Sequence, residues 1–326
     1  MRAIIQDRYG TADVVRLGDI PRPEPGPGQV LVRVHAASLN GSDRENLAGS
    51  PFYARVAGLR RPRNPVPGSD VAGVVTTAGS DVTGLAPGDE VYGELPGYRG
   101  GLAEYVVAAP RLLARKPAEL SFVEAAAIPQ AGCIAWRAVR VAGKVRQGDR
   151  VLVNGAGGAG GAFVVGLAKH AGAEVTGVDR ADKADHLRRA GADHTIDFET
   201  EDWAGHRERY DLVIDLVARR SPYRVHGALR PGGAYYLVGG RTRDLLATLA
   251  TGPAIHWFTG KRVRMLAVPQ SRDDLVAVTH WLTTAAVSPV VDRVYPFEEA
   301  PAAYERLADS ANRGKIVVQL AAARTG

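Results

Sequence analysis

The chain has 326 residues, of which 45% are hydrophobic and 23% charged, as in ordinary soluble globular proteins, and at this length we expect two domains. Its formal charge of +6 comes from scattered basic residues without interleaved aromatic residues, so no nucleic-acid partner is expected. An apolar run of about 18 residues and a signal-peptide core are both missing, so neither a membrane span nor secretion is indicated. The single cysteine, Cys133, excludes an intramolecular disulfide and favours a reducing cytoplasm.

Residues 1–121 are predicted to form a β-rich domain. The segment Gln29–His35 alternates apolar and polar residues as a half-buried strand does, so His35 is interpreted as a strand residue and not as a metal ligand. Proline and glycine turns separate the further predicted strands, which are 69–75, 89–93 and 103–107. Short strands between such turns predict a compact, barrel-like domain.

Residues 122–294 change to an alternation of strands and helices. Ser121 followed by Glu124 resembles a capping box, which predicts an apolar helix over 125–141 with an interruption at Pro129. Other predicted helices are 182–189, the segment opened by Ser221-Pro222, and 271–286; predicted strands include 174–178, 194–196, 211–215, 234–238 and 263–268, and 290–294 closes the series. This alternation predicts an α/β fold with a doubly wound parallel sheet of six strands.

Residues 295–326 return to short β and loop signals and end in a predicted strand over 315–319. We expect this segment to rejoin the first domain.

A glycine-rich loop lies between a predicted strand and a predicted helix over 150–164. Glycines allow a tight turn there and let backbone N–H groups approach a pyrophosphate at the helix N-terminus. The next strand ends at an acid, Asp179, as a dinucleotide site requires. Two registers fit the motif, Gly155-x-Gly157-x-x-Gly160 and Ala156-x-Gly158-x-x-Gly161, and both predict a dinucleotide site.

Several further motifs extend over nearly the whole chain: 25–32, 67–73, 87–91, 101–105, 151–156, 190–193, 229–233 and 314–317. Together they resemble the medium-chain dehydrogenase/reductase superfamily, in its zinc-free quinone-oxidoreductase (zeta-crystallin-like) branch. The resemblance implies a GroES-like β domain plus a Rossmann domain, with the active site in the cleft between them, and it favours the Ala156 register. It implies cofactor contacts at Gln130, Asn154, Ala156, Gly157, Gly158, Ala159, Gly160, Gly161, Asp179, Arg180, Lys183, Val217, Val238, Gly239, Gly240, Asn312 and Lys315.

Zinc-dependent relatives hold a catalytic metal at positions that match Asn40, Ser69 and Gln130 here. None of these is a usual zinc ligand, so we expect no metal. Without a Lewis acid, the resemblance implies hydride transfer from NADPH or NADH to an electron-poor acceptor, a quinone or an α,β-unsaturated ketone. Asn40 and Tyr53 are the predicted catalytic residues, as hydrogen-bond donors to the developing enolate oxygen. The alternatives are a turn residue for Asn40 and an ordinary loop aromatic for Tyr53.

The choice between NADH and NADPH stays open. Asp179 lies 18 residues after Gly161, where an acid accepts hydrogen bonds from the adenosine ribose and repels a 2′-phosphate. Arg180 and Lys183 could pair with a 2′-phosphate instead.

Two other functions remain open. An enoyl-thioester reductase would use Arg60, Arg61 and Arg63 as a basic mouth for the carrier's phosphate. A crystallin-like or RNA-binding protein with bound cofactor is the non-enzymatic alternative. The resemblance further implies a homodimer, with the strand over 263–268 at the sheet edge.

Overall fold

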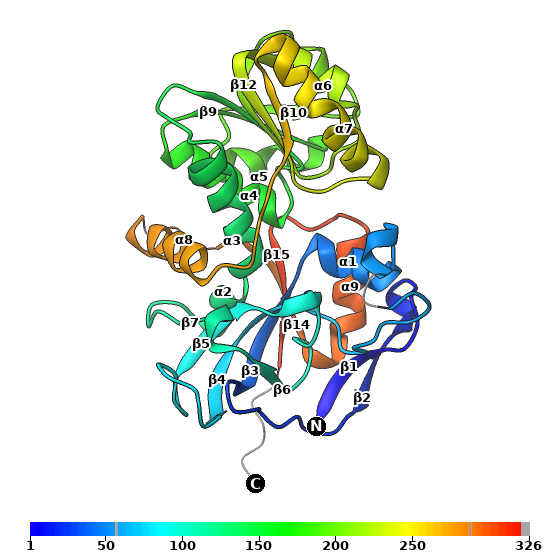
Figure 1. The fold of residues 1–326 in the computed structure, drawn as a ribbon, viewed down its shortest axis with the longest axis vertical. Coiled ribbons are helices and arrows are strands. Elements are labelled where there is room, and N and C mark those ends of the chain that lie inside the picture. The colour runs from blue at the N-terminus through cyan, green and yellow to red at the C-terminus, as the bar shows by residue number, and fades with distance from the viewer. Residues whose placement is uncertain (56–57, 286, 288, 321–326) are drawn as a thin grey trace. The chain divides into compact units, whose positions relative to one another are not determined.

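The computed structural model describes residues 1–55, 58–285, 287 and 289–320, and the side chains of Tyr53 and Tyr98 lie outside that description. The chain forms two compact units, which we treat separately. Unit 1 contains Met1–Gln130 and the chain from Gln270 onward, and unit 2 contains Ala131–Pro269. In Figure 1, unit 1 runs from blue to blue-green and from orange to red, and unit 2 from green to yellow.

A seven-stranded sheet forms the core of unit 1 and draws on both ends of the chain. Its strand order is β14-β15-β3-β4-β5-β7, and β6 pairs with β3. The strands are β3 Val30–Leu39, β4 Asp70–Ala78, β5 Glu90–Glu94, β6 Tyr105–Ala108, β7 Leu113–Arg115, β14 Val291–Pro296 and β15 Lys315–Gln319. Strand β15 runs antiparallel to β3, β3 antiparallel to β4, and β4 antiparallel to β5. A separate antiparallel pair consists of β1 Arg2–Gln6 and β2 Val15–Asp19.

The described helices of unit 1 are α1 Gly41–Ala48, α2 Phe122–Ala126, α8 Arg272–Thr284 and α9 Ala300–Ala308. The capping box before α2 is confirmed, because the Ser121 hydroxyl accepts a hydrogen bond from Glu124 N–H and the Glu124 carboxylate accepts one from Ser121 N–H. The apolar segment is interrupted between Ala126 and Pro129, where helix α3, Pro129–Trp136, begins, and a π-helical turn over Arg137–Ala142 follows it.

Unit 2 is built on a parallel sheet of six strands in the order β10-β9-β8-β11-β12-β13. The strands are β8 Arg150–Asn154, β9 Glu174–Asp179, β10 His194–Asp197, β11 Tyr210–Asp215, β12 Leu229–Leu237 and β13 Arg262–Met265, and the helices are α4 Ala159–His170, α5 Ala184–Arg189, α6 Pro222–Ala228 and α7 Thr242–Thr259. The order reverses between β8 and β11, and ligands of such sheets bind beyond the carboxyl ends of the strands at that point. The predicted Rossmann fold and its six strands are confirmed.

The prediction that the segment 290–294 closes the parallel sheet of unit 2 is wrong. Strand β14 pairs instead with β15 in the sheet of unit 1. The helix predicted over 271–286 is present as α8, but it also belongs to unit 1, where a hydrogen bond of 2.7 Å joins Thr279 Oγ1 to the Tyr92 hydroxyl on β5. The units therefore divide at residues 130 and 269 and not at the predicted 121 and 294.

Three helices of the described residues, α1, α7 and α9, have no counterpart among the predicted elements. The short and largely polar α1 has no apolar face to detect, and α7 contains Pro253, which argues against a helix. Helix α9 was predicted as β or loop, yet it buries Ala303, Tyr304 and Leu307 in the core of unit 1. Among the described residues, no helix combines the length and apolar character that crossing a membrane requires.

Candidate functional site

The glycine loop of unit 2 lies between β8 and α4, at the carboxyl end of the sheet. A Cβ on Gly161 would lie 2.3 Å from the Gly155 carbonyl oxygen and 2.5 Å from Ala156 Cα, so this position accepts only glycine. A Cβ on Gly160 would meet nothing closer than 3.8 Å. Since the third glycine of the motif is the one that lets helix and strand approach, the geometry selects the Ala156-x-Gly158-x-x-Gly161 register.

Gly158 is the N-cap of α4, which places the 12-residue helix directly after the loop. A Cβ there would have only the Gly155 carbonyl oxygen near it, at 3.6 Å, so the backbone faces open space. A helix N-terminus with an open backbone suits a pyrophosphate, and this loop therefore fits a dinucleotide.

Asp179, the last residue of β9, reaches the glycine loop. Its Oδ2 accepts a hydrogen bond from Gly157 N–H at 2.8 Å and its Oδ1 accepts one from Arg180 N–H at 2.9 Å. Lys183 Nζ lies 3.6 Å from Asp179 Oδ1, and both side chains are largely buried. The predicted ribose acid and the predicted phosphate-binding lysine thus lie side by side at the loop, whereas Arg180 is partly exposed and pairs with Asp182.

Asp215, the fully buried last residue of β11, joins the ends of three strands. Its carboxylate accepts hydrogen bonds from Asn154 Nδ2 at 2.7 Å, from the Tyr235 hydroxyl at 2.9 Å and from Val217 N–H at 3.2 Å. Burial raises the pKa of Asp215, although the hydrogen bonds from Asn154 and Tyr235 act in the opposite direction. Asn154 was a predicted cofactor residue, but Asp215 and Tyr235 were not.

The loops after β11 and β12 are joined by backbone hydrogen bonds. Ala218 N–H donates to the Gly239 carbonyl at 2.9 Å, Val238 N–H donates to the Asp215 carbonyl at 2.8 Å, and Ala218 bridges Gly240. The predicted residues Val217, Val238, Gly239 and Gly240 are therefore brought together with Asn154 at the switch point of the sheet.

Unit 1 carries a row of polar side chains across one end of its sheet. Lys315 starts β15, Asn40 follows β3, Asp70 starts β4 and Glu94 ends β5. Pairings of Ile316 with Leu39, Ser38 with Asp70, and Asp70 with Glu94 align these positions on four neighbouring strands.

The centre of this row is a fully buried ion pair. Lys315 Nζ donates to Asp70 Oδ2 at 3.1 Å and to Asn40 Oδ1 at 2.6 Å. Asn40 Nδ2 donates to Asp70 Oδ2 at 3.0 Å and to Ser69 Oγ at 3.5 Å. Both ends of the Asn40 amide are thus engaged inside unit 1, and Asn40 is also the N-cap of α1.

Gln130 connects two members of the row, Asp70 and Glu94. Its backbone N–H donates to Asp70 Oδ2 at 3.3 Å, its Nε2 donates to Glu94 Oε1 at 2.9 Å, and its Oε1 accepts from Ser42 Oγ at 2.9 Å. Burial, and next the charge of Asp70, raise the pKa of Glu94 to about 7.

Asp43, on α1, is a further buried carboxyl beside the row. Its Oδ2 accepts a hydrogen bond from Asn40 N–H at 2.7 Å. Burial, and next the charge of Asp70, raise the pKa of Asp43 to about 7.

The three positions that correspond to zinc ligands in metal-dependent relatives, Asn40, Ser69 and Gln130, lie together in this row. Amide and hydroxyl groups do not make a usual zinc site, and the Lys315 ammonium lies among them. Across the described residues, no group of three or more His, Cys, Asp or Glu side chains is arranged to hold a metal ion. The residues present do not fit zinc.

Two of the remaining predicted site residues, Asn312 and Tyr53, lie in unit 1. Asn312 is buried in unit 1, where its Nδ2 donates to the Gly314 carbonyl at 2.8 Å. Tyr53 lies in the 3-10 turn Phe52–Arg55, and its side chain is outside the described residues. Sequence reasoning missed Asp43, Asp70 and Glu94 as site residues. The available signal for the buried pair was that Lys315 and Asp70 each begin an otherwise apolar strand.

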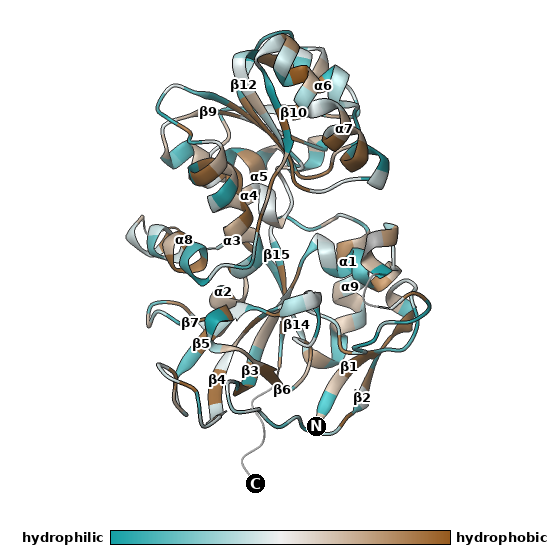
Figure 2. Cartoon of the chain, viewed as in Figure 1, coloured by the Kyte–Doolittle hydropathy of each residue, from teal (hydrophilic) through white to brown (hydrophobic). Residues whose placement is uncertain are grey.

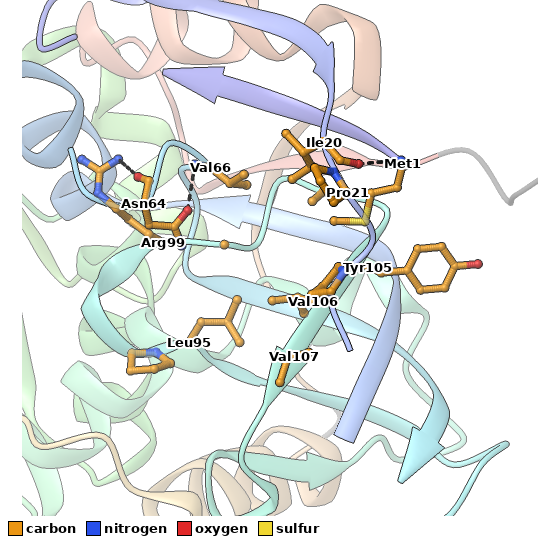
Figure 3. Close-up of a pocket in the computed structure, with 14 residues that line it drawn as sticks. Met1, Ile20, Pro21, Asn64, Val66, Leu95, Arg99, Tyr105, Val106 and Val107 are labelled. Atoms are coloured by element: carbon orange, nitrogen blue, oxygen red, sulfur yellow. Dashed lines mark hydrogen bonds between the residues drawn. The ribbon is translucent and has the colours of Figure 1, made fainter. Parts of the chain in front are cut away.

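A separate hollow of about 340 Å³ lies in unit 1 and is lined mainly by apolar side chains, among them Ile20, Val66, Leu95 and Val106 (Figure 3). Its guanidinium group, from Arg99, donates to the carbonyl oxygens of Asn64 and Asn46 and to Gln6 Oε1. These bonds hold the cation within unit 1, and the hollow contains none of the predicted site residues.

Comparisons with known proteins show which family the chain belongs to. Family models for the alcohol dehydrogenase GroES-like domain and for the zinc-binding dehydrogenase match residues 26–118 and 190–318. The chain is 32% identical to the 2-methylene-furan-3-one reductase of Solanum lycopersicum, over 98% of this chain and 79% of that protein. It is also 32% identical, with the same coverage, to the chloroplastic NADPH-dependent alkenal/one oxidoreductase of Arabidopsis thaliana. The solved quinone oxidoreductase of Coxiella burnetii superposes with a TM-score of 0.89 at 31% identity, over 98% of this chain and 99% of that one.

A GroES-like sheet unit and a parallel-sheet unit with a dinucleotide loop define an oxidoreductase that uses a nicotinamide cofactor. The chain belongs to the medium-chain dehydrogenase/reductase superfamily, in its quinone-oxidoreductase branch, as the sequence predicted.

Proposed function

We propose that this protein is a zinc-independent, NAD(P)H-dependent reductase that transfers hydride to a quinone or to the β-carbon of an α,β-unsaturated ketone. The observation that carries this proposal is the Lys315 ammonium, which pairs with Asp70 among the three positions that correspond to metal ligands. Without a metal to polarise a simple carbonyl, an acceptor that is already electron-poor is the suitable substrate. The names of the relatives, an enone reductase, an alkenal/one oxidoreductase and a quinone oxidoreductase, support the same class.

The cofactor would rest on unit 2. The Gly158 end of α4 would bind its pyrophosphate, Asp179 and Lys183 would face its adenosine ribose, and the loops at Val217 and Gly239 would face its nicotinamide ribose. Bound reduced nicotinamide supplies a hydride. The protein supplies orientation, exclusion of water and hydrogen bonds to the oxygen that gains charge.

Asn40 and Tyr53 remain the proposed donors to that oxygen. Because both ends of the Asn40 amide are already engaged, Asn40 would have to exchange its bond to Ser69 Oγ, the longest of its contacts at 3.5 Å, for one to the substrate. Unchanged kcat/KM for a good enone in both Asn40→Ala and Tyr53→Phe would refute this assignment.

A substrate panel tests the function as a whole. We expect NADH or NADPH oxidation with quinones and with cyclic or open-chain enones, and none with simple alcohols or saturated ketones. Turnover of crotonyl-type thioesters with no turnover of quinones would favour the enoyl-thioester reductase instead. Salt-sensitive RNA binding that competes with the cofactor, without reductase activity, would favour the non-enzymatic alternative.

We further propose a cytoplasmic homodimer formed through unit 2. Strand β13 is an edge strand, and Figure 2 shows brown, hydrophobic ribbon on the neighbouring helix α7. On that helix Trp257 and Phe258 are 85% and 82% exposed. An edge strand beside exposed aromatic residues supports pairing with a second copy. Cell fractionation tests the compartment.

A further inference from the structure

Three carboxyl groups and one ammonium group lie at the polar end of the unit 1 sheet. Asp43, Asp70 and Glu94 would carry three negative charges if all were ionised, while Lys315 carries one positive charge and bonds to Asp70. Because these carboxyl groups are buried or partly buried and lie close together, they cannot all be ionised at once. The cluster therefore retains protons near neutral pH. Burial and the charge of Asp70 raise the pKa of both Asp43 and Glu94 to about 7.

Of these three carboxyl groups, Glu94 alone reaches solvent. Asp43 is 1% exposed and Asp70 has no exposure, whereas Glu94 is partly exposed at the end of β5. Its orientation is fixed, because Glu94 accepts a hydrogen bond from Gln130 Nε2 at 2.9 Å and another from the side chain of Gln270. Ser42 in turn fixes the Gln130 amide.

Glu94 also lies close to the proposed substrate-oxygen donor. Asp70 Oδ2 accepts from Asn40 Nδ2 on one side and from Gln130 N–H on the other, and Gln130 continues to Glu94. The amide of Asn40 is engaged by Lys315, Asp70 and Ser69 and has no acidic proton to release. The carboxyl group of Glu94, at the edge of the cluster, has an acidic proton that it can release.

We propose that Glu94 is the catalytic proton donor of the enone reduction, an inference that rests on the proposed function. When the β-carbon of the enone has accepted hydride from the reduced nicotinamide cofactor, the electron pair of the C=C bond becomes an enolate. The O–H bond of the Glu94 carboxyl breaks, its proton forms the new C–H bond at the α-carbon, and the electron pair stays on the Glu94 carboxylate. Water then returns a proton to Glu94. The charged groups that face it are Asp70 on β4, Lys315 on β15 and Asp43 on α1.

The test compares Glu94→Gln with Glu90→Gln, at the other end of the same strand, where Glu90 is exposed and pairs with Lys116. We expect Glu94→Gln to lower kcat for an enone by about 100-fold or more, with the dissociation constant for NAD(P)H within twofold of the original. We expect the kcat/KM of the wild-type protein to fall as pH rises through about 7, and the kcat/KM of Glu94→Gln not to show this fall. In D₂O, wild type deuterates one face of the α-carbon and Glu94→Gln both faces. Glu90→Gln behaves as wild type.

Two further measurements distinguish a failure of the Glu94 assignment from a failure of the proposed function. Carbon-13 NMR of the cofactor-free protein reports the titration of Glu94 directly, and a midpoint near 4.5 would overturn the proposal. If Glu94→Gln does not fold, Glu94→Ala with added acetate replaces it, and recovery of the rate with acetate is expected. If the wild-type protein reduces neither quinones nor enones, the proposed function is refuted. If the wild-type protein is a reductase but the Glu94→Gln variant keeps its rate, its pH dependence and its selectivity for one face of the α-carbon, only the Glu94 assignment is refuted.

Discussion

Lys315 Nζ lies 3.1 Å from Asp70 Oδ2, and neither side chain has any solvent exposure. The two residues are joined across β15, β3 and β4, so the pair fixes the C-terminal strand of the chain to a strand near its beginning. Because the attraction operates away from water, losing one partner has a larger effect than losing a surface ion pair.

Lys315→Met should therefore destabilise the protein by about 3–5 kcal/mol, since it leaves the Asp70 carboxylate buried without its cation. Denaturant unfolding followed by circular dichroism measures this. The double variant Lys315→Met/Asp70→Asn should recover most of the loss. Lys169→Met, which breaks a partly exposed pair with Asp193, should cost less than about 1 kcal/mol. Equal losses for the two lysines would contradict the buried pair.

Gly161→Ala should abolish dinucleotide binding and destabilise unit 2, because its Cβ would lie 2.3 Å from a backbone oxygen. Gly160→Ala is the matched control: its Cβ meets nothing within 3.8 Å, and alanine favours the helix that it enters. Quenching of protein fluorescence by NADH and NADPH gives the affinities. Tolerance of Gly161→Ala with loss of binding in Gly160→Ala would mean that the other glycine register is correct.

Asp179→Ser should shift cofactor preference towards NADPH by about tenfold or more, roughly 1.4 kcal/mol. The carboxylate is placed to accept from ribose hydroxyls and to repel a 2′-phosphate, and its loss leaves the neighbouring Lys183 without that partner. The ratio of KM values for NADPH and NADH is the readout, with the exposed Asp185→Ser as control. An unchanged ratio would show that Asp179 serves only the glycine loop.

Asp43→Asn should stabilise the protein more as pH rises from about 4 to 7. Burial raises the folded pKa of Asp43 to about 7 from 3.8, so within this window the unfolded chain has lost a proton that the folded chain retains. The unfolded state then binds fewer protons, and the free energy of unfolding falls as pH rises. The gain from Asn should reach a few kcal/mol above pH 7, at about 1.4 kcal/mol per pKa unit.

Unfolding curves at several pH values check this prediction. The exposed Asp81→Asn should show no such trend. A gain from Asp43→Asn that is constant with pH would rule out a raised pKa at Asp43.

Trp257→Ser/Phe258→Ser should convert a homodimer to a monomer at micromolar concentration. Light scattering distinguishes the 34.6 kDa chain from its dimer. Tyr223→Ser, an equally conspicuous exposed aromatic at 64% exposure on α6, should leave the mass unchanged. A wild-type monomer would remove the proposed interface.

Local signals were sufficient for much of the fold. The capping box at Ser121, the apolar strands around the glycine loop and the acid at Asp179 follow rules that act over a few residues, and the structure contains each of them. Segments whose partners are distant were misjudged. The strand ending at Pro296 continues the alternation of helices and strands along the chain, and only its pairing with β15 assigns it to unit 1.

The sequence by itself determined the kind of cofactor and the family, because a glycine turn between a strand and a helix N-terminus is a local device with a fixed spacing. Only the tertiary structure decided which glycine is essential, since that depends on the 2.3 Å approach of Gly161 to Gly155. The tertiary structure also decided which groups lie at the positions that correspond to zinc ligands in metal-dependent relatives. Lys315, Asn40, Asp70 and Glu94 are far apart in the chain, and antiparallel pairing of four strands brings them into one row, where burial makes their charges interdependent.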